Sequence, residues 1–216
     1  GMTNISASQV KELREKTGLG LMDCKKALEE ANGDLDLAVE ELRKTSGLKA
    51  SKKSSRSAAD GLIGIKSSDG KSFMVEINCE TDFVARDDSF NSFMQEVLEI
   101  VSSSKDKSLE ELLEAGIEEK REKLVQKLGE NIVVRRITAS EDNADSSGVY
   151  LHSNNKIGTI ISLKGGTEEV AKEIAMHAAA TDPMAISPSD ISQDVIEKER
   201  EIYKAQSEES GKPADI

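Results

Sequence analysis

Apolar residues in the first 45 positions recur at three- and four-residue steps and predict three short helices. The first helix begins at a capping box formed by Ser6 and Gln9, and a Gly-rich break at residues 17–20 ends it. A second helix is expected over about residues 21–31. Asp34 follows a turn and can cap the third helix. The next residues, 45–57, are rich in Lys and Ser and predict a linker.

A pattern of two strands followed by a helix occurs twice in the rest of the chain. In each copy, two short apolar segments flank a polar turn, and a segment with helical periodicity follows. These segments are residues 61–65, 73–77 and 89–102 in the first copy, and 148–152, 157–163 and 167–180 in the second. Because neither copy can bury its apolar face alone, we expect the two to pack together.

Three further elements are predicted outside this repeat. Residues 117–128 favour a helix that Gly129 ends, and residues 131–138 favour a strand. A charged helix is predicted from about Ser192 to Ser210, with a narrow apolar stripe that includes Ile202 and Tyr203. That stripe is too small for a lone helix in water. The helix therefore needs a partner helix, from this chain or from a second copy in a homodimer.

The predicted fold class is α+β: an N-terminal three-helix module, two related hairpin-plus-helix subdomains and a C-terminal helical arm. The three helices around a Gly-containing loop resemble a ubiquitin-associated (UBA-like) module, a kind of module that usually binds proteins. The predicted divisions are residues 1–45 for the UBA-like module, 46–58 for the linker, 59–140 and 141–186 for the two α+β subdomains, and 187–216 for the helical arm.

Charge and hydropathy narrow the classes of partner. The 216 residues carry a net charge of −12, yet residues 1–58 hold 11 Lys/Arg and 9 Asp/Glu, so the rest of the chain is strongly acidic. An acidic body repels phosphate backbones, and nucleic acid is a poor candidate for a direct partner. No apolar run is long enough to span a bilayer, and no basic-then-apolar leader is present. We therefore expect a cytoplasmic protein without a membrane partner.

A strand-to-helix connection at residues 81–86 is the strongest candidate site. Asp87 or Asp88 can cap the helix that follows, and such connections face solvent and often carry function. The connection places Asp82 next to Phe83, in a chain with four Phe and no Trp. The ring could fold back onto the following helix, or it could be an apolar anchor for a partner. The second copy of the repeat has no Asp-Phe pair at this point, which favours the anchor.

The two cysteines give little support for metal or thiol chemistry. Cys24 and Cys79 lie far apart and form no CxxC pair, so we expect two reduced, buried thiols, with no metal and no cofactor. A catalytic Cys79 would need a histidine beside it. His152 and His177 are the available histidines, and the sequence places neither there.

One segment of the connection resembles a known family. Glu80-Thr81-Asp82-Phe83-Val84-Ala85 is similar to the signature loop of bacterial elongation factor Ts, a family that exchanges guanine nucleotide on elongation factor Tu. Further similarity covers essentially the whole chain, at residues 17–28, 31–34, 129–132 and 175–179. Long members of the family continue beyond the point that matches Ile216, so the resemblance implies that residues 187–216 are one arm of a truncated coiled-coil hairpin.

The resemblance also implies roles for particular residues. Thr81, Asp82, Phe83 and Val84 would approach the nucleotide site of elongation factor Tu, where Phe83 would act as a wedge between two helices of the G domain. This movement would displace the magnesium ion and disturb the phosphate-binding loop, so that GDP leaves. Leu21, Met22 and His152 match residues that contact the partner in this family. From the residues alone, Leu21 and Met22 could equally lie in the core, and His152 could be a polar residue at a strand end.

Three functional hypotheses follow. The first is a non-enzymatic exchange factor that binds elongation factor Tu in its GDP-bound and nucleotide-free forms. The second is a non-catalytic adaptor that uses the UBA-like module to bind a protein. The third is a Cys79-dependent enzyme, which would require a thiol of lowered pKa.

Overall fold

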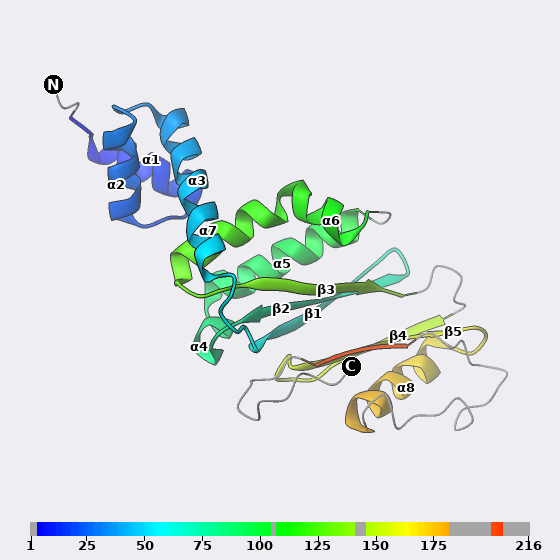
Figure 1. The fold of residues 1–216 in the computed structure, drawn as a ribbon. Coiled ribbons are helices and arrows are strands. Elements are labelled where there is room, and N and C mark those ends of the chain that lie inside the picture. Colours follow the sequence, from blue (N-terminus) through cyan, green and yellow to red (C-terminus); the bar gives the residue numbers. More distant parts are fainter. Residues whose placement is uncertain (1–3, 105–106, 141–145, 182–199, 205–216) are drawn as a thin grey trace. The chain divides into compact units, whose positions relative to one another are not determined.

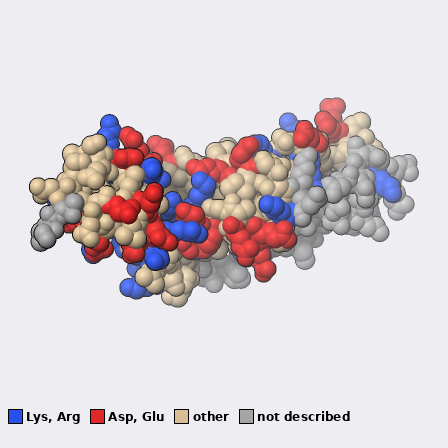
Figure 2. All heavy atoms as spheres, turned by 90° about the horizontal axis from the view of Figure 1, so that it is seen from above, with Lys and Arg blue, Asp and Glu red and all other residues tan. Residues whose placement is uncertain are grey.

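The computed structural model describes residues 4–104, 107–140, 146–181 and 200–204 (Figure 1). The chain forms two compact units. The first comprises Gly1–Ser57 and Leu113–Ile132, and the second comprises Ala58–Leu112 and Val133–Ile216. Acidic and basic side chains are interspersed on the face shown in Figure 2. Among the described residues, every helix is too short or too polar to cross a membrane.

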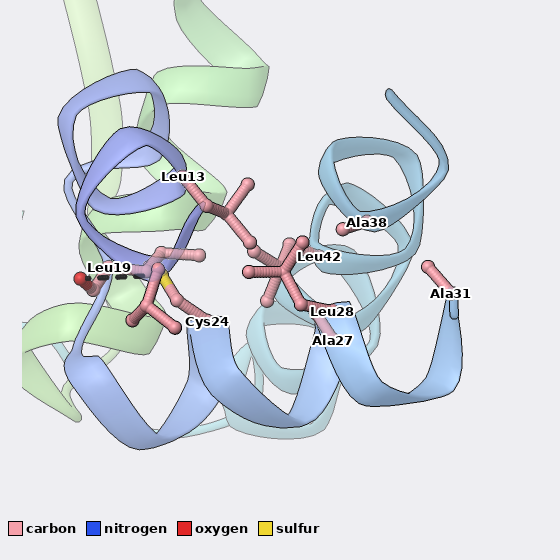
Figure 3. Close-up of a cluster of buried hydrophobic side chains, with 9 residues drawn as sticks. Leu13, Leu19, Cys24, Ala27, Leu28, Ala31, Ala38 and Leu42 are labelled. Carbon is pink, nitrogen blue, oxygen red and sulfur yellow. Dashed lines mark hydrogen bonds between the residues drawn. The ribbon is translucent and has the colours of Figure 1, made fainter. Parts of the chain in front are cut away.

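The first unit contains the three predicted N-terminal helices, α1 (Ala7–Thr17), α2 (Leu21–Glu30) and α3 (Leu35–Lys53). The predicted caps are confirmed. Ser6 and Gln9 form both hydrogen bonds of the capping box, and the Asp34 side chain accepts a hydrogen bond from the amide of Leu37 at 3.1 Å. Small and branched apolar side chains fill the space between the three helices, among them Leu13, Leu28 and Leu42 (Figure 3).

Helix α3 continues to Lys53, where the sequence predicted a linker from residue 46. The helix extends further than predicted because of a tertiary contact. Helix α7 (Glu118–Leu128) packs along α3 and buries Ser46 and Ala50, each 1% exposed. The Ser46 hydroxyl donates to the side chain of Gln126. A Lys- and Ser-rich segment is compatible with a helix once another helix covers one of its faces.

The first half of the second unit is a three-stranded antiparallel sheet in the order β1 (Asp60–Ser68), β2 (Lys71–Cys79) and β3 (Val133–Ala139). Asp69 and Gly70 form the β1–β2 turn with φ of 51° and 76°, as expected for a two-residue hairpin turn. Helix α5 (Asp88–Ser103) packs on β1 and β2. Between α5 and β3, α6 (Leu109–Leu112) and η1 (Leu113–Ile117) lead into α7.

The predicted second copy of the hairpin and helix is also present. Strands β4 (Ser146–Leu151) and β5 (Ile157–Leu163) pair antiparallel, and α8 (Glu168–Thr181) packs on both (Figure 1). The expectation that the two copies pack together is confirmed within the second unit. Ile63 and Met74 of the first sheet share one buried cluster with Ile160 of the second.

The prediction of a C-terminal helix is wrong for the part of it that the structure describes. Residues Arg200–Lys204 form strand β6, which pairs antiparallel with β5. Strand β5 would otherwise leave a row of backbone groups unpaired at that edge of the sheet, and an added strand satisfies them. The remainder of the predicted helical arm, and with it the predicted homodimer contact, lies outside the described residues.

We expect Gly148→Ala to destabilise the second hairpin by about 1–3 kcal/mol, because a Cβ at this position would lie 2.1 Å from the main-chain carbonyl carbon of Ala171 in α8. Backbone cannot yield as a side chain does. Hydrogen exchange of the β4 and β5 amides should become faster in this variant.

Gly47→Ala provides the matched control. A Cβ at Gly47 would meet the end of the flexible Glu122 side chain at 3.3 Å, in the interior of a helix. This variant should be neutral or stabilised by up to about 1 kcal/mol. Equal stability of the two variants would contradict the tight packing of α8 on Gly148.

Candidate functional site

The connection between β2 and α5 contains a single helical turn, α4 (Asp82–Ala85). Thr81 caps this turn, since its Oγ1 accepts a hydrogen bond from the amide of Val84 at 3.3 Å. Asp87 then caps α5 by accepting from the amide of Ser89 at 2.7 Å, as the sequence predicted. Two caps within seven residues fix the backbone of the connection.

The four residues of α4 divide into two buried and two exposed. Val84 is 9% and Ala85 2% exposed, whereas the Phe83 side chain is 76% exposed. Asp82 is also exposed. The structure therefore excludes the alternative in which the ring folds back onto α5. The contrast with the rest of the chain is sharp, because the other three phenylalanines are at most 4% exposed.

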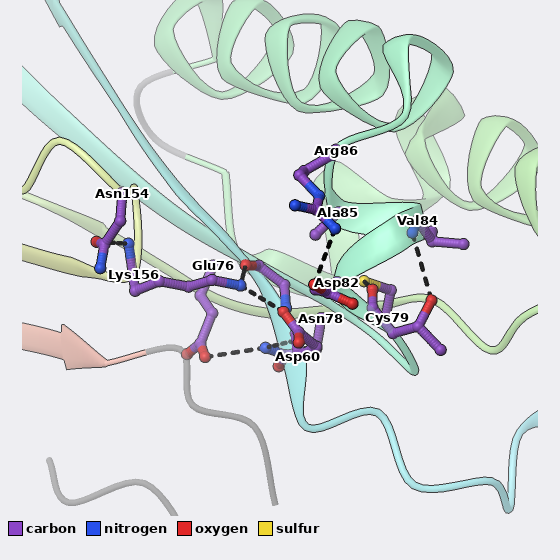
Figure 4. A network of polar contacts seen from close by, with 12 residues as sticks. Asp60, Glu76, Asn78, Cys79, Asp82, Val84, Ala85, Arg86, Asn154 and Lys156 are labelled. Carbon is purple, nitrogen blue, oxygen red and sulfur yellow. Dashed lines mark hydrogen bonds and ion pairs between the residues drawn. The ribbon is translucent and has the colours of Figure 1, made fainter.

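Arg86 contacts both exposed residues of α4. Its Nη2 donates to Oδ2 of Asp82 at 3.0 Å, and its Cζ lies 5.6 Å from the centroid of the Phe83 ring. Figure 4 shows the Arg86 side chain turned back toward Asp82. Sequence reasoning missed this residue, because the spacing becomes meaningful only when residues 82–85 are known to be helical.

The turn that carries His152 is attached to the same end of the β1–β2 hairpin as α4. Lys156 forms an ion pair with Asp60, the first residue of β1, which lies opposite Cys79 at the end of β2 (Figure 4). The carbonyl of Asn155 accepts from the amide of Ile63 at 2.8 Å. His152 itself is half-buried, and its Nδ1 accepts from the amide of Asn154 at 3.3 Å.

A buried polar network lies behind these loops and was not predicted. Glu76 on β2 is 1% exposed, and its Oε1 accepts from Nε of Arg136 on β3 at 2.9 Å. Its Oε2 accepts from Nδ2 of Asn78 at 3.1 Å, and the same amide donates to the backbone carbonyl of Asp60 at 3.2 Å. The signal in the sequence was a lone carboxylate in an apolar strand together with the Arg135-Arg136 pair in another.

Leu21 and Met22 belong to the first unit, where they begin α2. They are 54% and 74% exposed, while Leu19 just before them is 3% exposed. The structure thus excludes the alternative in which both lie in the core. An exposed Leu-Met pair next to a buried Leu offers adaptable apolar surface.

Both cysteines are buried thiols, as predicted. Burial raises the pKa of the Cys24 thiol, and the Thr17 hydroxyl partly offsets this effect. The Cys79 thiol donates to the carbonyl of Thr81 at 3.2 Å, so it supports the cap of α4. No group of three or more His, Cys, Asp or Glu that could hold a metal occurs in the described part of the chain.

Comparison with known proteins decides the family. A family model described as "Elongation factor TS" matches residues 80–216. Elongation factor Ts of Hahella chejuensis is 55% identical over 217 residues, covering 100% of this chain and 75% of that protein. Elongation factor Ts of Marinobacter nauticus is 52% identical, with 100% and 74% covered, and that of Francisella tularensis subsp. novicida is 49% identical, with 100% and 75% covered.

The chain belongs to the elongation factor Ts family.

Membership in this family confirms the resemblance found at residues 80–85. Elongation factor Ts is a non-enzymatic factor, so the prediction that the chain is not an enzyme is confirmed and the Cys79-dependent enzyme is excluded. This chain spans about three quarters of the length of the relatives that it matches.

We expect Glu76→Ala to destabilise this chain by about 3–5 kcal/mol, because it removes the buried carboxylate, 1% exposed, that pairs with the largely buried guanidinium of Arg136. The Arg136 side chain is 16% exposed. Urea denaturation followed by circular dichroism measures the effect.

Glu99→Ala is the control for this experiment, since Glu99 also pairs with a cation, Lys66, but is 66% exposed. Its loss should cost less than about 1 kcal/mol. If the two variants unfolded at the same urea concentration, the Glu76 network would not stabilise the hairpin.

Proposed function

We propose that this chain promotes the release of GDP from elongation factor Tu, with Phe83 as the wedge. The exposure of the Phe83 ring carries the proposal. Burying a phenylalanine side chain stabilises a protein by about 1.5–3 kcal/mol, and here that stabilisation is forgone in the free molecule. A ring presented on a capped turn is suited to insert between two helices of the partner's G domain, where the burial is recovered.

The remaining residues of the loop have different roles in this proposal. Asp82 enters the partner's nucleotide region beside the ring, and the resulting shift displaces the magnesium ion and disturbs the phosphate-binding loop. Thr81 and Val84 support the loop from within, because Thr81 caps α4 and the Val84 side chain is buried. His152 contacts the partner in the same region, since its turn is attached to the same end of the hairpin.

Thermodynamic linkage sets what such a factor must do. It must bind the nucleotide-free partner more tightly than the GDP-bound partner, and GDP must weaken its binding by the same ratio. A wedge that competes with the closed, magnesium-bound pocket supplies this difference in affinity. No covalent bond changes, so the factor needs no nucleophile and no cofactor. We place this activity in the cytoplasm.

Phe83→Ala should slow GDP release by about 30-fold or more, corresponding to the loss of an interface hot spot of about 2 kcal/mol. The assay follows loss of a fluorescent GDP analogue from elongation factor Tu. Met176→Ala is the matched control, because Met176 is an exposed apolar residue at 46% in the same unit, and it should release at the parental rate.

Two outcomes would contradict the proposal. An unchanged rate with Phe83→Ala would exclude the wedge. Binding of the parental chain to elongation factor Tu without faster release would instead favour a non-catalytic adaptor that uses the N-terminal module.

Met22→Ala should weaken the binding of the factor to elongation factor Tu and leave the release of GDP from the complex unchanged. Met22 lies in the N-terminal helical module, in a different unit from Phe83, and its side chain is 74% exposed. We expect a higher half-saturating concentration of the factor, by about three- to tenfold, with little change in the maximal release rate. Leu37→Ala, which removes another exposed apolar side chain of this module, should leave both constants unchanged. A lower maximal rate for Met22→Ala would show that this residue acts in the exchange step itself.

A further inference from the structure

The side chain of Arg86 joins the two exposed residues of the α4 turn. Residues three and four positions apart lie on the same face of a helix, and Arg86 follows Phe83 and Asp82 by these two spacings. Its guanidinium donates to the Asp82 carboxylate at 3.0 Å, and its Cζ lies 5.6 Å from the centroid of the Phe83 ring. One cation therefore contacts both groups that the proposed wedge requires.

A ring as exposed as Phe83 has little packing to fix its rotamer. Ordering such a side chain during binding costs free energy, and a group that orders it beforehand lowers that cost. The backbone of Arg86 is held in place, because its amide closes α4 by donating to the carbonyl of Asp82 at 3.1 Å, while its side chain is 68% exposed. Its planar guanidinium can stack on a ring and bind a carboxylate at the same time, which a lysine ammonium cannot do equally well.

We propose that Arg86 is a positioning residue, which holds the Phe83 ring and the Asp82 carboxylate in the arrangement that enters the partner. The inference rests on the proposed function of Phe83. In this role Arg86 acts on the partner only through Phe83 and Asp82. A direct contact between Arg86 and elongation factor Tu is the competing role, and it does not depend on the presence of the Phe83 ring.

The first experiment is a double-mutant cycle on the GDP-release assay. Arg86→Met removes the cation and keeps an unbranched side chain, and it should lower the maximal release rate by about three- to tenfold with little change in the half-saturating concentration. In a Phe83→Ala background the same change should have almost no effect, since there is no ring to position. Arg86→Lys should restore part of the rate.

Lys71→Met is the matched control. Lys71 forms the other cation–ring contact of the described chain, 5.9 Å from the Phe73 centroid near the opposite end of the hairpin. Phe73 is buried, and this variant should exchange nucleotide at the parental rate. An equal loss from Arg86→Met with and without Phe83 would overturn the positioning role in favour of direct contact. A parental rate for Arg86→Met would overturn both roles.

The second experiment needs no partner. In the free protein, NMR should show the side-chain protons of Arg86 shifted upfield by the Phe83 ring current, and Phe83→Leu should abolish this shift. Absence of the shift in the parental chain would overturn the proposal even if Phe83 is the wedge. Conversely, if Phe83→Ala releases GDP at the parental rate while the ring-current shift is present, the proposed function fails and the intramolecular contact stands.

Discussion

The burial of Val84 and Ala85 is the constraint on which the exposed surface depends. A helix of four residues has one turn, so burying the last two directs the first two, Asp82 and Phe83, toward solvent. Thr81 and Asp87 cap the segment on either side and prevent the turn from unwinding into a longer loop. The exposure of the ring is thus a consequence of core packing beneath it. It does not depend on a flexible loop that happens to be extended.

The polar network around Glu76 connects the end of β2, which leads into α4, to the second sheet. Arg136 binds Glu76, Asn78 links Glu76 to the carbonyl of Asp60, and Asp60 pairs with Lys156 on the turn that follows His152. A buried carboxylate is costly unless it is fully paired. Each contact in this polar network therefore restricts the position of the next residue in it. The two hairpins are therefore joined by charge at one end and by the apolar cluster around Ile63 and Met74 elsewhere.

Local signals in the sequence predicted most elements because their causes are local. Capping by Ser6, Asp34 and Asp87 depends on residues within one turn, and the repeated hairpin follows from alternating apolar positions. The extension of α3 was missed because the helix that covers Ser46 is some 80 residues away in the sequence. Glu76 was missed for a similar reason, since its partner Arg136 becomes a neighbour only when β2 and β3 are paired in register. The sequence leaves the exposure of Phe83 open, because a phenylalanine in a connection between two elements can pack on the following helix or point to solvent.

Nucleotide exchange differs from bond-making catalysis in what it asks of a surface. An enzyme must place titratable groups to within a fraction of an ångström, whereas an exchange factor needs one feature that fits the open state of its partner and clashes with the closed state. A phenylalanine is well suited to this task, since its ring is rigid beyond two side-chain torsions and buries a large apolar area. The cost of keeping such a ring in water is offset only if its position is defined before the encounter, because disorder would consume the free energy gained on insertion. A turn with two caps, two buried residues and an arginine that contacts the ring and its acidic neighbour meets that requirement with side chains from a single short segment of the chain.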